Sequence, residues 1–454
     1  MSIIESKVNQ EQYDIFETSL HNSYFIDPKL FSKYDIKKGL RNADGTGVMA
    51  GLTKVSSVEG YVIYDGEKLP QEGKLYYRGI NLNNLVEACI AESRFGFEEI
   101  AYLLLFGNLP DKEELARFSG VLSDSRELPE DFTEDMIMKA PSANVMNKMA
   151  RSVLALYSFD KDPDNLDAPN VMRQCIQLIA QLPVIMAYAY QVKRRTFYHK
   201  SMYLHPLVPG LSTAETILRS IRSTKKYTPE EARLLDLCLM LHADHGGGNN
   251  STFATRVITS SGADTYASIA SGISALKGPK HGGANIKVSE MVSMMLDTID
   301  DPDNDAEVKD FLADVITKKA GDGSGLIYGM GHAVYTKSDP RAVILSSKAG
   351  EFSEGTEFER EYRALAAIER LTPEVFATIK GSDKAMCANV DLYSGLVYKM
   401  LRIPEDLYTP VFTCARIAGW SAHRIEELLT GGRIIRPAYK NVGESRNYVP
   451  ISER

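Results

Sequence analysis

Apolar residues recur along most of this chain with the spacing of amphipathic α-helices. An apolar face at the helical period covers 97–107, 212–221, 232–245, 285–299, 359–371 and 411–429. Gly107 follows the first of these segments, which is typical of a helix C-cap, and Glu215 sits in the second at the capping-box position. Residues 60–79 instead carry short β-rich runs around an Asp-Gly pair, which predicts a hairpin. The pattern predicts a mainly α protein with a small β-hairpin near the N-terminus.

The longest apolar stretch, 176–190, has the length of a core helix rather than a membrane span. Gln177, Gln181 and Pro183 interrupt it, so we expect a buried helix with a proline kink. The first residues lack an apolar core and carry acidic side chains without arginine, unlike a signal peptide or a mitochondrial presequence. We therefore expect a cytoplasmic protein without a membrane partner.

Composition narrows the class of protein and of ligand. The 454 residues suffice for two or three domains, and 44% hydrophobic with 25% charged residues is typical of a folded globular chain. Five cysteines are scattered without a metal-binding spacing, which favours a reducing compartment. A net charge of −8 offers no basic footprint for nucleic acid. An anionic substrate would have to be held by clustered arginines.

Glycine-rich breaks between the predicted helices mark the candidate functional segments. They lie at 246–248, 278–283, 321–331 and 431–432. Glycine there suits helix caps and corners, hinges, or loops that approach a ligand closely. Each of the first three breaks has a histidine in it or beside it, in HADHGGGNN, GPKHGGAN and YGMGHAVYTKSDPR. This coincidence favours a functional site built from the breaks.

Two kinds of chemistry could use these side chains. One is metal-dependent hydrolysis, with ligands drawn from His242, Asp244, His245, His281, His332 and Asp391. The HxxH spacing, however, differs from the i, i+4 pair of an HExxH helix. The other is metal-free acid–base chemistry on a substrate rich in carboxylates, which needs a carboxylate base, neutral imidazoles and arginine forks. Arg341, Arg416 and Arg436 could supply the forks, and Arg416 lies within an apolar helix, where an unpaired charge is costly.

Four motifs in this order, HADHGGGN, GPKHGGAN, GMGHAVYTKSDPR and ANVDLYSGLVYKML, resemble those of the citrate synthase family. YYRGI, FEEIAYLLLFGNLP and LPVIMAYAYQ are similar to the family's upstream segments, and the resemblance spans roughly residues 60–440. It implies a large helical domain over 46–284 and 398–454, and a smaller helical domain over 285–397 with a cleft between them. Residues 1–45 would then form an N-terminal extension.

The resemblance also implies a role for each residue of a catalytic set. Asp391 would remove a proton from the methyl group of acetyl-CoA. Because such carbon acids have pKa values of roughly 20, against about 4 for aspartate, the enolate needs a placed donor in a dry site. His281, just before a helix expected to begin near Asn285, would be that donor as a neutral imidazole. His332 would protonate the ketone of oxaloacetate, and water would then hydrolyse citryl-CoA.

Substrate binding follows from the same resemblance. His245 would bind oxaloacetate, with Arg341, Arg416 and Arg436 on its carboxylates. Arg436 would come from the partner subunit, so a homodimer or larger assembly is expected. Gly329, Gly331 and Lys337 are the candidate CoA contacts. No metal and no cofactor is implied, because acetyl-CoA is a substrate.

The sequence departs from the family pattern at two positions. Thr336 stands where the animal members carry an arginine that helps to hold CoA phosphates, and Gly246 stands where many members have glutamate. Neither change touches the proposed chemistry. His242, His423 and Cys387 are assigned structural roles.

Three alternatives remain open beside the citrate synthase hypothesis. A 2-methylcitrate synthase would use propionyl-CoA with the same residues, because one methylene changes binding by only about 1–3 kcal/mol. A metal-dependent hydrolase is the alternative of another class. A non-catalytic acyl-CoA binder is disfavoured by the intact set of His281, His332 and Asp391.

Overall fold

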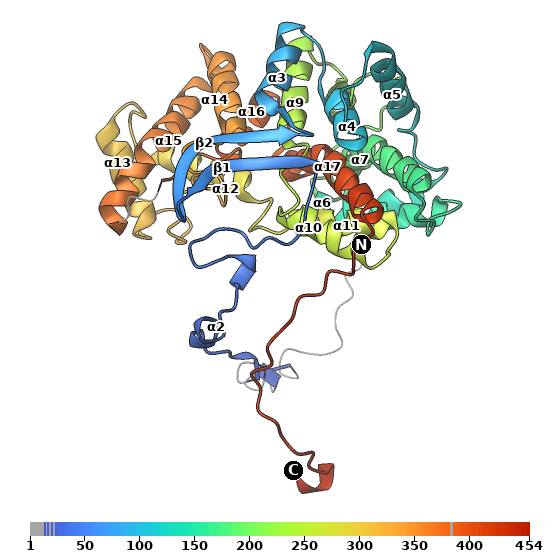
Figure 1. Ribbon diagram of the computed structural model, residues 1–454. Coiled ribbons are helices and arrows are strands. Elements are labelled where there is room, and N and C mark those ends of the chain that lie inside the picture. The colour runs from blue at the N-terminus through green and yellow to red at the C-terminus, as the bar shows by residue number, and fades with distance from the viewer. Residues whose placement is uncertain (1–12, 15, 18–19, 21–22, 382–384) are drawn as a thin grey trace. The chain divides into compact units, whose positions relative to one another are not determined.

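The computed structural model describes residues 13–14, 16–17, 20, 23–381 and 385–454. Within them the chain is mainly helical with one small antiparallel sheet (Figure 1), which confirms the predicted fold class. Two segments form separate compact units, Met1–Gly51 and Leu52–Arg454. The α-helices of the second unit are α3 Leu82–Ala91, α4 Phe97–Phe106, α5 Lys112–Asp124, α6 Val145–Leu156, α7 Ala168–Phe197, α8 Thr213–Ile221, α9 Pro229–His242, α10 Asn250–Ser260, α11 Thr265–Leu276, α12 Ala284–Thr298, α13 Asp305–Ile316, α14 Pro340–Ser353, α15 Glu359–Lys380, α16 Asp391–Met400 and α17 Tyr408–Leu429. Shorter helical turns are η2 Thr133–Met138, η3 Tyr157–Phe159, η4 Glu405–Leu407 and η5 Ile451–Glu453.

The first unit contains little regular structure in its described part. A short helix, α2, spans Lys29–Lys33, and a 3₁₀ turn, η1, spans Lys38–Leu40. A bridge between Arg41 and Gly47 closes a turn. The extension predicted over residues 1–45 falls largely on this unit, and its boundary stays a prediction.

The predicted hairpin opens the second unit. Strand β1, Ser56–Tyr64, pairs antiparallel with β2, Glu67–Tyr77, and the short β3, Ile80–Asn81, pairs with β2. Asp65 and Gly66 form the turn with φ of +50° and +81°, the backbone that an Asp-Gly pair favours in a tight hairpin. The sheet begins before the predicted residue 60 because Tyr77, fully buried, pairs with Ser56 and draws the start of β1 into the sheet.

Helix α17 is the centre of the core and packs against α4, α7, α9, α10 and α11. Its side chains Arg416, Trp420 and Arg424 are among the largest fully buried residues. Helix α7 contains the predicted segment 176–190 and continues through Pro183. Among the described residues it is the one helix long and apolar enough to cross a membrane, yet 83% of its most apolar window is buried inside the protein. That burial is the pattern of a core helix.

Helix boundaries confirm some capping signals and correct one prediction. Helix α4 ends at Gly107 in the left-handed conformation, and Ser212 caps α8 in a capping box with Glu215. Helix α9 begins before the predicted residue 232, because Thr228 forms a second capping box with Glu231. It ends at His242 rather than at residue 245. The HADH motif therefore leaves the helix and forms a turn.

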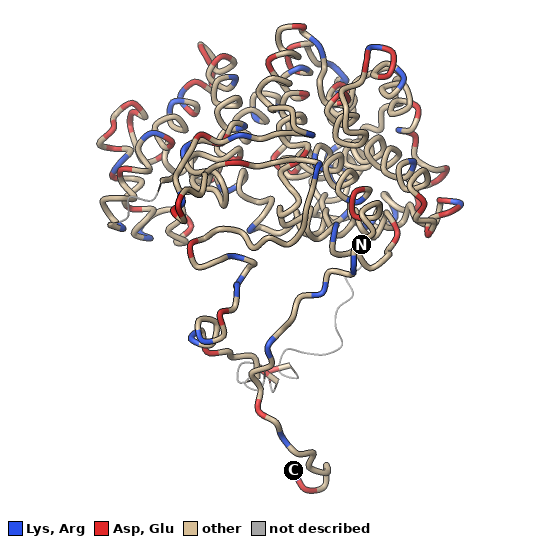
Figure 2. Tube along the Cα trace, in the orientation of Figure 1, with Lys and Arg blue, Asp and Glu red and all other residues tan. Residues whose placement is uncertain are grey.

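Helices α12 to α16 pack on one another: α12 and α14 contact α16, and α13 contacts α15. Figure 1 shows α13, α14 and α15 on the opposite side of the unit from α4, α5 and α7. Lys, Arg, Asp and Glu are interspersed along these outer helices rather than separated by sign (Figure 2). The predicted small domain over 285–397 covers α12 to α15 and most of α16, and its exact limits stay a prediction.

Candidate active site

The turn after α9 is held by Asp244, which is completely buried. One oxygen of its carboxylate, Oδ2, accepts hydrogen bonds from the Ser56 hydroxyl and from the Gly246 amide at 3.0 Å. His423 approaches the same oxygen with Nε2 at 3.2 Å, while its Nδ1 lies 2.7 Å from the guanidinium of Arg256. Because an arginine can only donate, Nδ1 accepts and Nε2–H donates to Asp244. His423 thus contacts Asp244 from the interior, in keeping with its predicted structural role.

His245 follows Asp244 and is itself buried. Burial and the nearby positive charges of Arg341 and Arg416 hold the pKa of His245 well below its usual value, so its imidazole is neutral at pH 7. Its Nε2 is buried and has no hydrogen-bond partner among the residues that the structure describes. This nitrogen is therefore available to a bound group.

His332 lies against His245, with ring centroids 5.1 Å apart and planes close to perpendicular. Its ring also stacks on Tyr335 at 4.5 Å. Its Nδ1 accepts hydrogen bonds from the backbone amides of Val334 at 3.0 Å and Tyr335 at 2.9 Å. An Nδ1 that accepts leaves the proton of the neutral ring on Nε2. The backbone therefore sets His332 as an Nε2–H donor.

Backbone pairing between two loops links the positions of His332 and Asp391. The amide of Gly331 donates to the carbonyl of Cys387 at 2.7 Å, and the amide of Asn389 donates to the carbonyl of Gly329 at 2.8 Å. The Asn389 side chain adds hydrogen bonds to Gly331 O and from Asp391 N. Cys387 acts here through its backbone and its thiol is buried, which agrees with the structural role assigned to it.

Gly329 can be replaced by no larger residue without moving this loop. Its φ is +82°, and a Cβ would lie 2.9 Å from the Cα of Leu392 on α16. Gly331 also has a positive φ, +90°. These two glycines, predicted as CoA contacts, have a demonstrable structural reason. Their contact with CoA stays a prediction.

Asp391 is the first residue of α16. Burial raises the pKa of its carboxyl to about 6, although the positive charges of Arg341 and Arg416 pull the pKa down. A carboxylate with that pKa is ionised at neutral pH and is a stronger base than an ordinary aspartate. The environment of Asp391 therefore suits a general base.

His281 lies between α11 and α12, with its Nε2 3.1 Å from the hydroxyl of Ser251. Burial, with a further contribution from the charge of Arg416, lowers the pKa of His281 to about 4. The ring is neutral at pH 7, as the helix-terminus argument expected, but burial is the main cause. The same Ser251 hydroxyl accepts a hydrogen bond from the Trp420 indole at 3.2 Å and donates its proton to Asn249 Oδ1 at 2.9 Å. Ser251 fixes which way the His281 ring faces.

Arg341 is buried and already paired with a carboxylate. Its Nε and Nη2 donate to the two oxygens of Asp339 at 3.0 and 2.7 Å. Asp339 also caps α14 by accepting from the Arg341 amide at 3.0 Å. Arg341 was predicted to grip the substrate with its fork, but Asp339 occupies one edge of that fork. Only the remaining edge of the guanidinium is available to a ligand.

Arg416 has no such carboxylate among the residues that the structure describes. It is 1% exposed, its Nε donates to the carbonyl of His242 at 2.7 Å, and its buried Nη1 has no hydrogen-bond partner among the described residues. Burial lowers the pKa of Arg416 to about 10, and the charge of Arg341 adds to this effect. A buried cation without a paired anion costs several kcal/mol, which makes Arg416 a candidate for binding an anion.

Three residues named from the sequence remain, Arg436, Lys337 and His242. Arg436 and Lys337 are exposed, and the structure does not bring Arg436 to the buried side chains of its own chain. His242 is buried against Phe412, with ring centroids 4.1 Å apart, and its structural role stays a prediction.

Among the described residues, no three His, Cys, Asp or Glu side chains converge as a metal site requires. The metal-hydrolase hypothesis gains no support from the geometry.

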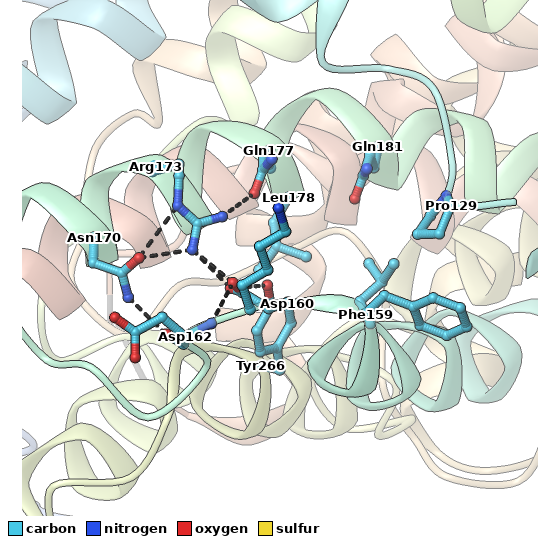
Figure 3. A pocket seen from close by; sticks show the side chains of 12 residues that line it. Pro129, Phe159, Asp160, Asp162, Asn170, Arg173, Gln177, Leu178, Gln181 and Tyr266 are labelled. Atoms are coloured by element: carbon cyan, nitrogen blue, oxygen red, sulfur yellow. Dashed lines mark hydrogen bonds and ion pairs between the residues drawn. The ribbon is translucent and has the colours of Figure 1, made fainter.

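A separate pocket of about 430 Å³ lies between α7, η3 and α11 (Figure 3). Arg173 crosses it and binds Asp160 at 2.7 Å, while Asn170 and Gln177 accept from the same guanidinium. Tyr266 donates to Asp160 from the opposite side. Arg173 and Asp160 satisfy each other, and none of the predicted site residues lines this pocket.

Sequence reasoning missed two members of the site. Asp339, directly before a proline, carries an N-cap signal that points to its position at the start of α14. Ser251 carries no such signal, because its contact with His281 joins α10 to the segment between α11 and α12, thirty residues further along the chain.

Comparison with known proteins adds an independent line of evidence. A family model described as the C-terminal domain of citrate synthase matches residues 42–438. A citrate synthase of Synechocystis is 33% identical over 412 residues, covering 90% of this chain and 92% of the relative. A 2-methylcitrate synthase of Corynebacterium glutamicum is 32% identical over 430 residues, covering 93% of this chain and all of the relative.

A solved structure shows the same arrangement. Citrate synthase from the archaeon Thermoplasma acidophilum, in a ternary complex with carboxymethyl coenzyme A and oxaloacetate, superposes with a TM-score of 0.73 at 27% identity. The match covers 92% of this chain and 99% of that one. The motifs, the fold and these matches agree, and the chain belongs to the citrate synthase family of acyl-transferring enzymes.

Proposed function

We propose that this enzyme condenses acetyl-CoA with oxaloacetate and hydrolyses the resulting thioester to citrate and CoA. The observation that carries the proposal is the group formed by the buried His245 and Arg416 and the half-buried His332. Two neutral imidazoles lie 5.1 Å apart, and a buried guanidinium with an unpartnered Nη1 influences the pKa of His245. Neutral donors beside an unmatched buried cation suit a small dicarboxylate with a ketone.

Oxaloacetate binding uses the cations and His245. One carboxylate is bound by Arg416, whose Nη1 is left without a partner among the described residues. The open edge of Arg341 and the Nε2 of His245 provide further donors, and Asp339 keeps Arg341 from rotating. Charge-assisted hydrogen bonds of this kind are about twice as strong as neutral ones.

The condensation divides proton transfers among three residues. Asp391 takes a proton from the methyl carbon of acetyl-CoA, and His281 donates a hydrogen bond to the thioester oxygen as the enolate forms. The enolate carbon attacks the ketone carbon of oxaloacetate, and the ketone oxygen takes the proton from Nε2 of His332. Water then attacks the thioester of citryl-CoA, giving citrate and the CoA thiol.

The magnitudes decide which residue contributes most to proton removal. A methyl pKa of roughly 20 against about 4 corresponds to a gap on the order of 20 kcal/mol. Raising the pKa of Asp391 to about 6 closes about 3 kcal/mol of it, at about 1.4 kcal/mol per pH unit. Stabilisation of the enolate by His281 and exclusion of water must supply the larger part.

The neutral state of His281 matters because an enolate in a dry site needs a donor of similar acidity. With a pKa of about 4, His281 is uncharged at pH 7. Ser251 contacts Nε2 of His281 at 3.1 Å and orients the ring, while the proton of the Ser251 hydroxyl is donated to Oδ1 of Asn249.

The test is thiol release from a panel of acyl-CoAs with oxaloacetate, measured with a disulfide reagent. We expect release with acetyl-CoA that depends on oxaloacetate and that is lost in Asp391→Asn. The family contains 2-methylcitrate synthases of 32% identity, so the panel includes propionyl-CoA. A kcat/KM for propionyl-CoA well above that for acetyl-CoA would replace the acetyl-CoA proposal. Thiol release without oxaloacetate, sensitive to chelators, would point to a metal-dependent hydrolase.

We also propose a homodimer in which Arg436 completes the site of the partner subunit. The segment carrying Arg436 has no helix or strand between residues 430 and 450 and is nearly all exposed. Large apolar side chains on it, Ile434, Tyr439 and Tyr448, are 59%, 92% and 81% exposed. Such side chains in an extended segment are more often covered by a partner chain than left in water.

Co-expression of two inactive variants tests this arrangement. In a heterodimer of Asp391→Asn and Arg436→Ala, one site carries both defects and the other carries neither. Random pairing should therefore restore about a quarter of wild-type activity. Activity no higher than that of the separate variants would contradict a shared site.

The expected cytoplasmic location is also a proposal. All five cysteines are free and buried, which supports a reducing compartment. Fractionation of cells with an antibody to the chain tests it, and recovery in a membrane or organelle fraction would contradict it.

A further inference from the structure

The hairpin β1–β2 contains one irregularity in its pairing. Glu59 pairs with Lys74 and Tyr61 pairs with Pro70, so Gly60 alone faces three residues of the opposite strand, 71–73. A bulge of this kind takes backbone groups out of the hydrogen-bond ladder between the strands and leaves them free to bind other partners. Here the partners are the side chains of Thr336 and Ser338.

Thr336 binds backbone carbonyls on both sides of the bulge. Its hydroxyl oxygen hydrogen-bonds to the carbonyl of Gly60 and lies 3.2 Å from the carbonyl of Gln71. One side chain thus contacts the carbonyls of both strands at the point where the ladder is interrupted. Position 336 is also the place where this chain departs from the arginine of the animal members, so its residue has a different partner here.

Ser338 binds the strand opposite Gly60. Its oxygen accepts a hydrogen bond from the Gly73 amide at 3.1 Å, and its hydroxyl donates to the carboxylate of Glu72. Thr336 and Ser338 are two residues apart, and the side chains of both bind the hairpin at the bulge. The two hydroxyl groups bind the backbone groups at the bulge: Thr336 binds the carbonyls of Gly60 and Gln71, and Ser338 binds the amide of Gly73.

The two strand glycines allow the segment to approach this closely. A Cβ on Gly60 would lie 2.5 Å from the Cα of Tyr335 and from the carbonyl oxygen of Val334. A Cβ on Gly73 would overlap the carbonyl oxygen of Ser338. Side chains at either position would push the segment away from the hairpin.

The segment held in this way carries the site residues. The amides of Val334 and Tyr335, which bind Nδ1 of His332, lie directly before Thr336. The helix that begins with Pro340 and Arg341 follows Ser338 by two residues. The hairpin bulge therefore binds the segment that connects His332, the candidate acid, to Arg341, a candidate carboxylate-binding residue.

We infer that Thr336 and Ser338 are positioning residues: docked on the β1–β2 bulge, they hold the backbone that fixes the tautomer and orientation of His332. The inference rests on the proposed function, in which Nε2–H of His332 protonates the ketone. Thr336 acts through the backbone of residues 334–335 and not by contact with CoA.

Three variants test the inference. Thr336→Val keeps the shape and removes the hydroxyl, Thr336→Ser restores it, and Gly73→Ala pushes Ser338 away. Thr317→Val is the matched control, because Thr317 also donates to a backbone carbonyl but lies exposed directly after the end of α13. Displacement of catalytic groups by about 1 Å can cost up to ~10²-fold in rate. We expect kcat to fall about tenfold or more in Thr336→Val and Gly73→Ala, and to stay within about threefold of wild type in Thr336→Ser and the control.

The steady-state pattern separates positioning from a CoA contact. A positioning role lowers kcat with little change in KM for acetyl-CoA, whereas loss of a CoA contact raises that KM with kcat retained. Wild-type kcat in Thr336→Val, or a change confined to KM, would overturn the inference.

A readout independent of activity keeps this test separate from the proposed function. Nitrogen-15 NMR of the histidine rings should show the Nε2–H form of His332 in wild type and a mixture of tautomers in Thr336→Val. An unchanged His332 spectrum in a folded Thr336→Val protein would also overturn the inference. If the wild-type spectrum is as expected but no acyl-CoA is condensed, the proposed function fails and the structural inference stands.

Discussion

Replacing Asp391 by asparagine should abolish activity and make the folded protein more stable at neutral pH. Burial raises the pKa of this carboxyl from an ordinary value near 3.8 to about 6. A group whose pKa is raised on folding binds its proton more tightly in the native state. Wild-type stability therefore falls as pH rises from about 4 to about 6, because ionisation is less favourable in the folded protein.

The size of the effect follows from the two pKa values. At about 1.4 kcal/mol per pH unit, the separation corresponds to about 3 kcal/mol. Asparagine does not ionise, so the stability difference between variant and wild type should grow by about 2 kcal/mol between pH 4 and pH 8, because the unfolded carboxyl is already partly ionised at pH 4. Comparing the two pH values cancels any constant difference in packing between aspartic acid and asparagine.

The assay is urea unfolding of both proteins at several pH values and one fixed protein concentration. Activity measured alongside should fall at least ~10²-fold, the usual contribution of a general base. Asp297→Asn, which removes one exposed charge from α12, is the matched control for activity and should retain it. A stability difference that is constant from pH 4 to pH 8 would refute the claim that burial raises the pKa. Retained condensation would refute the assignment of the base.

Three further substitutions test other parts of the site. Arg416→Met should raise KM for oxaloacetate at least about 30-fold, because truncating a buried charged partner costs 2–5 kcal/mol. It should also raise the melting temperature of the ligand-free protein, since it removes a buried unpaired cation; a lower melting temperature would contradict this. His332→Gln should lower kcat by about 10²- to 10⁴-fold with little change in melting temperature, and a small kcat effect would remove it as the acid. Ser251→Ala should lower kcat about three- to tenfold with KM for oxaloacetate unchanged, and an unchanged kcat would show that Ser251 does not orient the His281 ring.

The helical part of the fold was predictable because its signals are local. Ser212 with Glu215 and the glycine at 107 set helix ends within four residues of themselves, and the structure confirms them. The start of α9 was missed although Thr228 and Glu231 carry the same signal, because the apolar period was followed instead of the cap. The start of β1 was missed for a different reason: Ser56 joins the sheet through Tyr77, a contact between residues far apart in the sequence.

The site shows the same division between local and distant contacts. The glycine-rich breaks with their histidines identified the segments that carry His245, His281 and His332. The pairing of Arg341 with Asp339 was within reach, because the two are neighbours in the chain. The contact of Ser251 with His281, and of Thr336 with the hairpin bulge, depends on tertiary packing that no local pattern encodes. Composition could say that an acidic chain needs clustered arginines, but only the fold shows which arginine is buried without a carboxylate.

The most direct test of the proposed mechanism is the primary deuterium isotope effect on kcat/KM for acetyl-CoA, measured from pH 4.5 to pH 8. If Asp391 removes the methyl proton, acetyl-CoA deuterated at the methyl group should react more slowly. The rate should fall tenfold per pH unit below an apparent pKa at or above about 6, because bound oxaloacetate adds negative charge near Asp391. Two results together would contradict proton removal by this carboxylate. They are a kcat/KM that does not change down to pH 4.5, and equal kcat/KM for ordinary and deuterated acetyl-CoA when the chemical step limits the rate.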